Sequence, residues 1–325
     1  MPDFSSFPWP VDGGALRFDE FMAAALYDPA LGYYGRRIRE VGRRGDFSTS
    51  ASLGGLLGEA VAAWARGAMK STGCRDLIEL GPGNGTLARQ VRESFPWHRR
   101  PRLHLVERSP ALRAIQQQTL GAKASWHDSL TAALAACGGR ACVYSNEFVD
   151  AFPVRRFRRE PTGWAEQFVL PDASLWRPCP SLPSSSIFER DWPPGHVVEV
   201  HDSFHHWLRQ NLAGWKSGRM LTIDYGDEIH GLYHRQPGGS LRAYFHHQCL
   251  TGPEALARPG HQDLTADVNF TDLARWLAPV AARVSLKSQS AFLADHADNS
   301  GADRFLADPD GAGGAFLVLD MECRL

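Results

Sequence analysis

The sequence predicts an α/β fold built on a mainly parallel sheet. From residue 76 onward, short apolar runs alternate with segments of helical apolar spacing, a pattern typical of parallel strands joined by right-handed helical crossovers. The apolar run at 77–80 then turns abruptly into a helix through closely spaced glycines. Glycine tolerates positive φ and has no Cβ to block a ligand, so this turn predicts a nucleoside site at the end of a buried strand.

The expected elements follow in order along the chain. Helical spacing appears at 18–27 and 53–69, ahead of the alternating region. We expect strands at 76–80, 103–107, 122–126, 141–145 and 220–224, and helices at 86–94, 110–120 and 128–137. We also expect a hairpin at 154–159 and 164–170, helices near 204–212, 271–277 and 292–306, and closing strands near 283–286 and 315–321.

These elements predict one main domain that carries insertions. A long stretch of different texture separates the strand at 141–145 from the strand at 220–224. We therefore divide the chain into an N-terminal helical segment, 1–70, and a main domain, 71–325, with a lobe inserted at about 155–215 and a second insertion at about 230–267.

Composition is that of an ordinary globular protein. Of the 325 residues, 43% are hydrophobic and 22% are charged, and the net charge is -1. Because a near-neutral chain has no global attraction for nucleic acid or an anionic membrane, we predict neither as a partner. The arginine run at 155–159 is accordingly interpreted as a solvated or ion-paired face. The N-terminus lacks the features of a signal or transit peptide, and no window suits a membrane span, so we predict a cytoplasmic protein.

The cysteine and histidine patterns do not predict a metal site. The six cysteines include no C-x-x-C pair, which argues against a zinc knuckle or a disulfide framework. His201/His205 and His230/His234 have the i,i+4 spacing of helical metal ligands but lack the H-E-x-x-H form. We interpret these histidines as solvent-facing.

The glycine turn carries the most specific chemical signal. A dinucleotide fingerprint would place Gly or Ala at position 86, where this chain has Thr86, and an acidic Glu79 would repel a pyrophosphate. A nicotinamide oxidoreductase is therefore disfavoured. The same carboxylate would attract an ammonium or a sulfonium, and S-adenosylmethionine carries both, so Gly81, Gly83 and Gly85 with Glu79 predict a site for that cofactor. The alternative is an ordinary strand–helix turn that binds nothing.

Two further acidic residues follow the next two strands. Glu107 ends the strand at 103–107, about 20 residues beyond the glycines, where a carboxylate accepts both hydroxyls of a ribose. Asp128 and Ser129 follow the third strand, so Asp128 would either contact the adenine amino group or cap the next helix. For Glu107 the alternative is an exposed strand-end carboxylate.

The fourth strand ends in a candidate acceptor site. Asn146 and Glu147 fall at the carboxyl edge of the sheet, and Asp150 follows closely. Methyl transfer needs an aligned nucleophile more than covalent help. If the nucleophile is a guanidinium, carboxylates in fork geometry must hold its charge, and Glu147 and Asp150 could do so with Asn146 orienting the pair. Alternatively, Asn146 and Asp150 only shape a turn.

Several motifs occur in an order that resembles one family. They are Gly45-Asp46-Phe47-x-Thr49-Ser50, Glu79-Leu80-Gly81-Pro82-Gly83-x-Gly85-Thr86-Leu87, Leu105-Val106-Glu107-x-Ser109-Pro110-x-Leu112-Arg113, Asn146-Glu147-Phe148-x-Asp150-Ala151-x-Pro153-Val154, Ile223-Asp224-Tyr225-Gly226, Leu241-Arg242-Ala243-Tyr244 and Asp263-Leu264-Thr265-Ala266-Asp267-Val268. Together they resemble the MidA family of methyltransferases, from about Arg17 to past Phe270. Ala51, Phe152 and Gly239 depart from the family pattern beside these motifs.

The resemblance implies a fold and a function. It implies a class I, Rossmann-like S-adenosylmethionine-dependent methyltransferase with a seven-stranded sheet, a lobe that caps the substrate, and an N-terminal segment that closes the cofactor site. In that segment Asp46, Phe47, Thr49 and Ser50 are the implied cofactor contacts.

The same resemblance implies a protein arginine side chain as methyl acceptor, by analogy with one branch of the family. A protein substrate is therefore the expected partner, and a homodimer is one assembly that we consider. The alternatives are a methyltransferase for a small molecule or another nucleophile, and a non-catalytic assembly scaffold that retains the fold.

Overall fold

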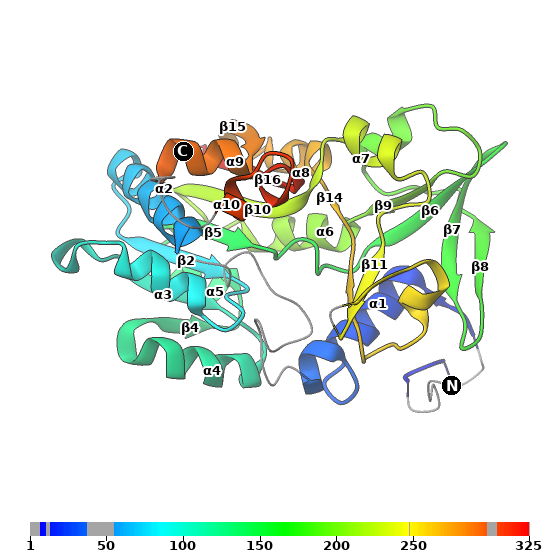
Figure 1. Cartoon of the computed structure of the whole chain (residues 1–325), viewed down its shortest axis with the longest axis horizontal. Helices are drawn as coiled ribbons and strands as arrows, with labels where there is room; N and C mark the ends of the chain where they lie inside the picture. Colours follow the sequence, from blue (N-terminus) through cyan, green and yellow to red (C-terminus); the bar gives the residue numbers. More distant parts are fainter. Residues whose placement is uncertain (1–6, 11–13, 38–54, 247, 298–303, 325) are drawn as a thin grey trace. The chain divides into compact units, whose positions relative to one another are not determined.

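The computed structural model describes residues 7–10, 14–37, 55–246, 248–297 and 304–324 (Figure 1). The chain divides into two compact units, each built from three segments. The first unit comprises residues 1–38, 149–207 and 227–273, and the second comprises 39–148, 208–226 and 274–325. The implied cofactor contacts Asp46, Phe47, Thr49 and Ser50 lie outside the described residues.

The second unit is built on the predicted sheet. Seven strands of this unit run in the order β4-β3-β2-β5-β10-β16-β15 within a sheet of eight. Their bounds are β2 Asp76–Leu80, β3 Arg102–Val106, β4 Ser125–His127, β5 Cys142–Asn146, β10 Arg219–Asp227, β15 Ala281–Ser288 and β16 Phe316–Cys323. The five from β4 to β10 are parallel, whereas β16 is antiparallel to both of its neighbours. This is the predicted Rossmann-like sheet, and its strand order reverses between β2 and β5, the point where such sheets bind ligands.

Helices flank this sheet. Their bounds are α2 Leu56–Thr72, α3 Thr86–Glu93, α4 Pro110–Leu120, α5 Leu130–Ala136, α9 Gln289–His296, α10 Arg304–Ala307 and α11 Ala312–Ala315, with short 3₁₀ turns η3 Trp97–Arg99 and η4 Gly121–Lys123. Gly73 ends α2 in the left-handed conformation, and Ser109 caps the start of α4 with Pro110 in its first turn.

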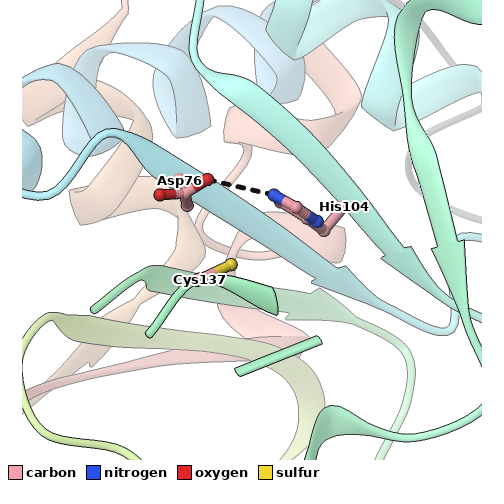
Figure 2. A group of neighbouring side chains, drawn as sticks. All are labelled: Asp76, His104 and Cys137. Atoms are coloured by element: carbon pink, nitrogen blue, oxygen red, sulfur yellow. Dashed lines mark hydrogen bonds and ion pairs between the residues drawn. The ribbon is translucent and has the colours of Figure 1, made fainter. Parts of the chain in front are cut away.

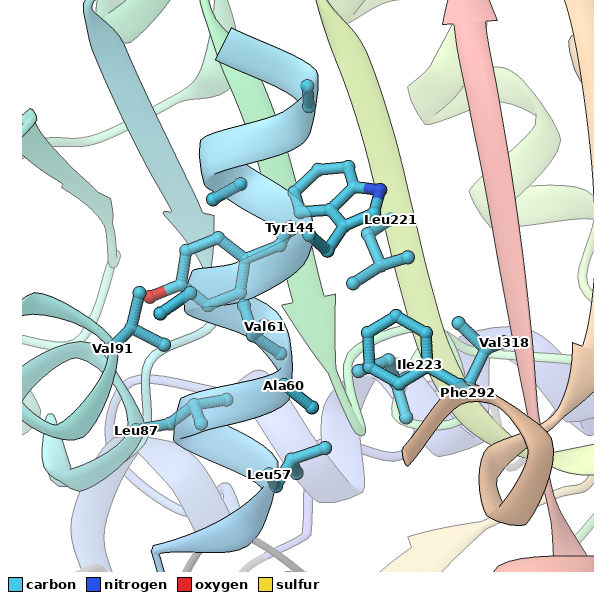
Figure 3. Packing of buried hydrophobic residues seen from close by; sticks show 14 of the residues in the cluster. Leu57, Ala60, Val61, Leu87, Val91, Tyr144, Leu221, Ile223, Phe292 and Val318 are labelled. Atoms are coloured by element: carbon cyan, nitrogen blue, oxygen red, sulfur yellow. The ribbon is translucent and has the colours of Figure 1, made fainter. Parts of the chain in front are cut away.

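One apolar cluster holds α2 against the sheet (Figure 3). Leu57 and Val61 of α2 pack in the same buried cluster as Tyr144 of β5, Ile223 of β10 and Phe292 of α9. Each fully buried aliphatic side chain stabilises the fold by about 1.5–3 kcal/mol. The strand residues near the predicted cofactor site therefore rest on a rigid base.

The first unit contains two small sheets. In the larger, β1 Leu16–Arg17, β7 Gly163–Val169, β6 Arg155–Glu160 and β9 Val197–Val200 lie in that order, and β8 Ser174–Pro178 pairs with β7. The smaller has the order β12 Gln248–Thr251, β11 Arg242–Phe245, β13 Asp263–Thr265. The remaining elements are α1 Phe18–Tyr27, the π-helix η1 Tyr33–Arg37, η5 Ser186–Glu189, α7 Ile229–Arg235, η6 Gly252–Leu256 and β14 Val268–Asn269. Two further helices are α6 Asp202–Asn211 and α8 Phe270–Leu277.

The arginine run of the first unit is ion-paired. Arg155 lies 2.6 Å from Glu166, and Arg156 lies 2.9 Å from Glu199. Both carboxylates are buried, so the guanidinium groups compensate charges that would be costly to bury alone. For Arg155 and Arg156, the interpretation as a solvated or ion-paired face is confirmed in its ion-paired form.

Some sequence expectations were wrong in detail. The strand expected at 122–126 begins only at Ser125, because residues 121–123 form the turn η4. The smaller sheet at 242–265 was not expected at all. His201, interpreted as solvent-facing, is only 3% exposed, and burial lowers its pKa to about 3. Within the described ranges, no helix combines the length and the apolar character needed to cross a membrane.

Candidate functional site

The glycine turn follows β2 directly. Gly81, Gly83 and Gly85 have φ of 60°, 54° and 80°, which is the left-handed region that glycine enters at no steric cost. The backbone N–H of Gly81 donates to Val106 of β3 at 3.1 Å, so the turn is tied to the neighbouring strand. The prediction that glycines are needed here for positive φ is confirmed.

Gly81 is also needed for close packing. A Cβ at this position would lie 2.7 Å from Cδ2 of Phe148, a distance that real Cβ atoms do not tolerate. Phe148 follows β5, so this contact brings the segment after β5 against the segment after β2. The turn and the candidate acceptor residues are thus neighbours across the point where the strand order reverses.

Glu79 lies beneath the turn, on the buried face of β2. It is 2% exposed, and one of its carboxylate oxygens accepts a hydrogen bond of 2.7 Å from the hydroxyl of Tyr144. Burial raises the pKa of Glu79 to about 8, although the Tyr144 bond acts in the opposite direction. Because a nearby cation favours the charged form of a buried carboxyl, a cationic ligand beside Glu79 would help it to ionise.

Glu107 follows β3 and is held from two directions. Oε1 accepts from the backbone N–H of Ser109 at 2.8 Å, and Oε2 accepts from the Gln116 amide at 3.2 Å. Burial raises the pKa of Glu107 above its usual value. The alternative of a freely exposed strand-end carboxylate is therefore wrong.

Gln116 is the central polar side chain of this region. Its Nε2 donates to the carbonyl oxygen of Gly83 at 2.8 Å as well as to Glu107, and its Oε1 accepts from the Trp126 indole at 3.0 Å. The side chain is fully buried. Gln116 was not among the predicted residues, although a glutamine in the apolar stripe between Leu112 and Leu120 of α4 was a usable signal.

Asp128 does not cap α5. The cap is Ser129, whose hydroxyl accepts from the backbone N–H of Ala132 at 3.1 Å. The Asp128 carboxylate instead accepts from Arg113 at 2.6 Å, and its side chain is 86% exposed. Arg113 also donates to the backbone carbonyl of Glu107, so it joins the segments after β3 and β4.

Asn146 and Glu147 lie together at the end of β5. The Asn146 amide donates to Oε1 of Glu147 at 3.0 Å. Glu147 has φ of 52°, which is rare and strained for a residue other than glycine. Its backbone is fixed by a bond from Glu147 N–H to the Ile223 carbonyl, and the next N–H, of Phe148, donates to Asp224. Strain that is held by surrounding structure is a mark of functional sites.

Asp150 belongs to the first unit. It is 8% exposed, and Oδ2 accepts from the Thr265 hydroxyl at 2.9 Å. Its suggested part in holding a substrate stays a prediction.

The second unit thus gathers most of the predicted site at one edge of its sheet. Gly81, Gly83 and Gly85 leave the turn without a Cβ at three positions, Glu79 is a buried acceptor, Glu107 is a partly buried one, and Asp128 is open to solvent. These groups suit a ligand with a cationic end, a vicinal diol and an exocyclic amine, which are the features of S-adenosylmethionine. Tyr144, Arg113 and Gln116, which hold these acids, were not among the predicted residues.

Comparison with known proteins supports this chemistry. The family model described as "Putative S-adenosyl-L-methionine-dependent methyltransferase" matches residues 56–286. The chain is 30% identical to "Protein arginine methyltransferase NDUFAF7, mitochondrial" of Mus musculus, over 85% of this chain and 71% of the relative. The Homo sapiens protein of the same name is 29% identical, over 86% and 69%.

A solved structure is also similar over nearly the whole chain. It is a likely methyl transferase from Burkholderia thailandensis bound to S-adenosyl-homocysteine. Sequence identity is 28%, the TM-score is 0.80, and the match covers 96% of this chain and 88% of the other.

The relatives overturn one expectation. They are named as mitochondrial proteins, so the predicted cytoplasmic location is wrong. The prediction rested on the missing signals near Met1, and such an absence carries no information on where a protein works. The fold, the cofactor and the enzyme class, in contrast, agree with the sequence analysis, and the chain belongs to this family of S-adenosylmethionine-dependent methyltransferases.

Proposed function

We propose that the chain methylates a guanidinium nitrogen of a protein arginine. The name of the mouse relative supports an arginine acceptor. The observation that carries the proposal is the Asn146–Glu147 pair, held in a strained backbone at the end of β5. A carboxylate fixed there can take two N–H groups of a guanidinium and so aim the remaining nitrogen.

The cofactor contacts are proposed on the same basis. Glu79 would face the ammonium of the methionyl arm, Glu107 the ribose hydroxyls, and Asp128 with Ser129 the adenine edge. Gly81, Gly83 and Gly85 would allow close approach of the backbone. Asp46, Phe47, Thr49 and Ser50 are proposed to complete the site, on the resemblance alone.

S-adenosylmethionine supplies an electrophilic methyl group on a sulfonium. The residues of the chain then have two tasks. Glu147 and Asn146 orient the guanidinium so that a nitrogen lone pair meets the methyl carbon in line. Bound there, the cofactor would supply the methyl group and keep the electron pair of the broken bond, and the Glu147 carboxylate would accept the excess N–H proton of the methylated nitrogen.

The test separates cofactor binding from methyl transfer. Glu147→Gln keeps the size of the side chain but removes the charge. We expect an unchanged affinity for S-adenosylhomocysteine by calorimetry, and a rate of protein methylation at least about 100-fold lower, as for the loss of a positioned acid–base group. Glu93→Gln, which alters an exposed acid of α3, is the matched control and should leave both unchanged.

The products identify the acceptor. Incubation with labelled methyl donor and mitochondrial protein, followed by mass spectrometry, should place the label on arginine. Label on a small molecule or on another side chain would contradict the arginine proposal. Full activity of Glu147→Gln would remove its assigned role, and tight cofactor binding with no transfer would favour a scaffold.

A further inference from the structure

A separate group of side chains lies at the amino end of β2 and in the middle of β3. Asp76 is the first residue of β2, His104 is the third residue of β3, and Cys137 follows α5 directly (Figure 2). The glycine turn follows the other end of β2, about 16 Å away at 3.3 Å per residue. This group therefore takes no part in the proposed methyl transfer. The sequence did not suggest it, because its members are far apart in the chain.

The three side chains bring one oxygen, one nitrogen and one sulfur close together. Among the described residues, these ligand atoms form a group in which all lie within 4.8 Å of one another. Oδ1 of Asp76 and Nε2 of His104 are 3.0 Å apart. In a tetrahedral zinc site, with bonds of about 2.0–2.3 Å, neighbouring ligand atoms are about 3.3–3.6 Å apart. Small rotations of the side chains would bring the group to that geometry.

Each of the two buried ligands is oriented by a further partner. Arg102 lies 2.5 Å from Oδ2 of Asp76, the oxygen that does not face His104. Nδ1 of His104 lies 2.9 Å from Nε2 of His127. A metal on Nε2 of His104 would leave the proton on Nδ1, from which it can be donated to His127. Metal-binding histidines and carboxylates usually have such outer partners, which fix the ring tautomer and the ligand direction.

We propose that Asp76, His104 and Cys137 bind a zinc ion, with water as the fourth ligand. Mixed oxygen, nitrogen and sulfur ligands suit this borderline-soft ion, and hard cations such as Mg²⁺ would not select the thiol. On binding, the Cys137 sulfur forms the bond to the metal and its proton leaves to water. The ion would join β2, β3 and the segment after α5, so its expected role is to stabilise the second unit.

Cobalt substitution tests the ligand set. Protein freed of metal with a chelator is titrated with Co²⁺, which occupies zinc sites and shows thiolate-to-metal absorption. We expect one equivalent to produce this absorption, Zn²⁺ to displace it, and Cys137→Ser to abolish it. Cys249→Ser, which changes an exposed cysteine, is the matched control and should retain it. Absence of the absorption in the wild type, or its persistence in Cys137→Ser, would overturn the proposal.

A second measurement uses the unaltered chain and so does not depend on folding of a variant. Zn²⁺ should protect Cys137 from alkylation, read by mass spectrometry, and should leave Cys249 reactive; equal labelling of Cys137 with and without Zn²⁺ would contradict the site.

His127→Phe should weaken Zn²⁺ binding about 10–100-fold, as loss of an outer partner does. At 100 times the dissociation constant, Zn²⁺ should raise Tm by about 5–10 °C. Addition of Zn²⁺ should not change the affinity of the wild type for S-adenosylhomocysteine, which distinguishes this site from the cofactor site.

Discussion

The Glu79 carboxyl is buried and holds its proton at neutral pH, so a cationic ligand beside it would favour its ionisation. Its pKa is about 8 because the carboxyl is buried, and the ordinary value is 4.5. Ionising it in place at pH 7 therefore costs about 1.4 kcal/mol, which corresponds to one pKa unit. A bound ammonium offsets this cost. Cofactor binding and loss of the Glu79 proton are then coupled.

We accordingly predict that affinity for S-adenosylhomocysteine rises with pH. Below about pH 8 the free protein carries the Glu79 proton, and binding must release it. Affinity should increase up to about tenfold per pH unit between pH 6 and 8 and then level off. Calorimetry in two buffers of different ionisation enthalpy would detect the released proton. Glu79→Gln should bind more weakly at pH 8 and lose this dependence; a wild type with the same affinity at every pH would contradict the assignment of Glu79 to the ammonium.

Gln116 should be needed both for stability and for cofactor binding. Gln116→Met keeps the volume but removes the bonds to Gly83 and Glu107, and it leaves the Trp126 N–H without its acceptor. Loss of these bonds should destabilise the protein by about 1–3 kcal/mol and weaken S-adenosylhomocysteine binding about tenfold. Gln117→Met is the matched control, because Gln117 is the exposed neighbour on the same helix. Urea unfolding and calorimetry would measure both effects, and equal behaviour of the two variants would exclude the positioning role.

Among the elements, the strand–turn–helix unit of β2 and α3 depends on its glycines. In Gly81→Ala the new Cβ would meet Phe148 at 2.7 Å in a backbone with φ of 60°. Both effects are unfavourable, so we predict a loss of stability of about 1–3 kcal/mol. Gly67→Ala is the opposite control: this glycine lies in α2 with open space around it, and alanine should stabilise the helix by about 1 kcal/mol. Thermal unfolding would compare them, and a neutral Gly81→Ala would show that the contact relaxes freely.

The elements that sequence predicted well are those with local signals. The helix α4 has its Ser109 cap, Pro110 and a regular apolar stripe, and its expected bounds, 110–120, are those found. The sheet at 242–265 was missed for the opposite reason. Its strands β11, β12 and β13 have three or four residues each, and β11 pairs with both of the others. Short strands have no readable period, and their pairing partners are not local in sequence.

For the molecule as a whole, strand topology predicted where the candidate site residues come together, but not which side chains hold them in place. Carboxyl ends of neighbouring parallel strands meet at one edge, so the position of Glu79, Glu107 and Asn146 could be read from strand order. Tyr144 donates to Glu79 from a strand 65 residues further along the chain, and no local pattern marks such a pair. The Asp76 group escaped notice for the same reason. Contacts between distant segments depend on how many residues from several segments pack together, so no single stretch of sequence predicts them.

The stability of the two units should depend on pH in opposite ways. His201 is in the first unit and Glu79 in the second, and burial shifts the two pKa values in opposite directions, to about 3 and about 8. Below pH 6.5 His201 binds a proton in the unfolded protein but stays neutral in the folded protein. The first unit should therefore lose stability as the pH falls. Between about pH 4.5 and 8 the folded Glu79 keeps a proton that the unfolded form releases, so the second unit should lose stability as the pH rises.

If the units unfold together, the two contributions to the free energy of unfolding cancel between about pH 4.5 and 6.5. If they unfold separately, calorimetry should resolve two transitions whose midpoint temperatures move in opposite directions as the pH changes. The variant His201→Phe tests the His201 contribution alone, because it removes this titrating group from its buried position. Between pH 7 and pH 5 the wild type should lose about 2 kcal/mol of unfolding free energy because His201 is protonated only in the unfolded form. His201→Phe has no such group, so it should not lose this amount. The exposed His98→Gln is the control and should follow the wild type. Parallel pH profiles for wild type and His201→Phe would mean that His201 does not stay neutral in the folded protein.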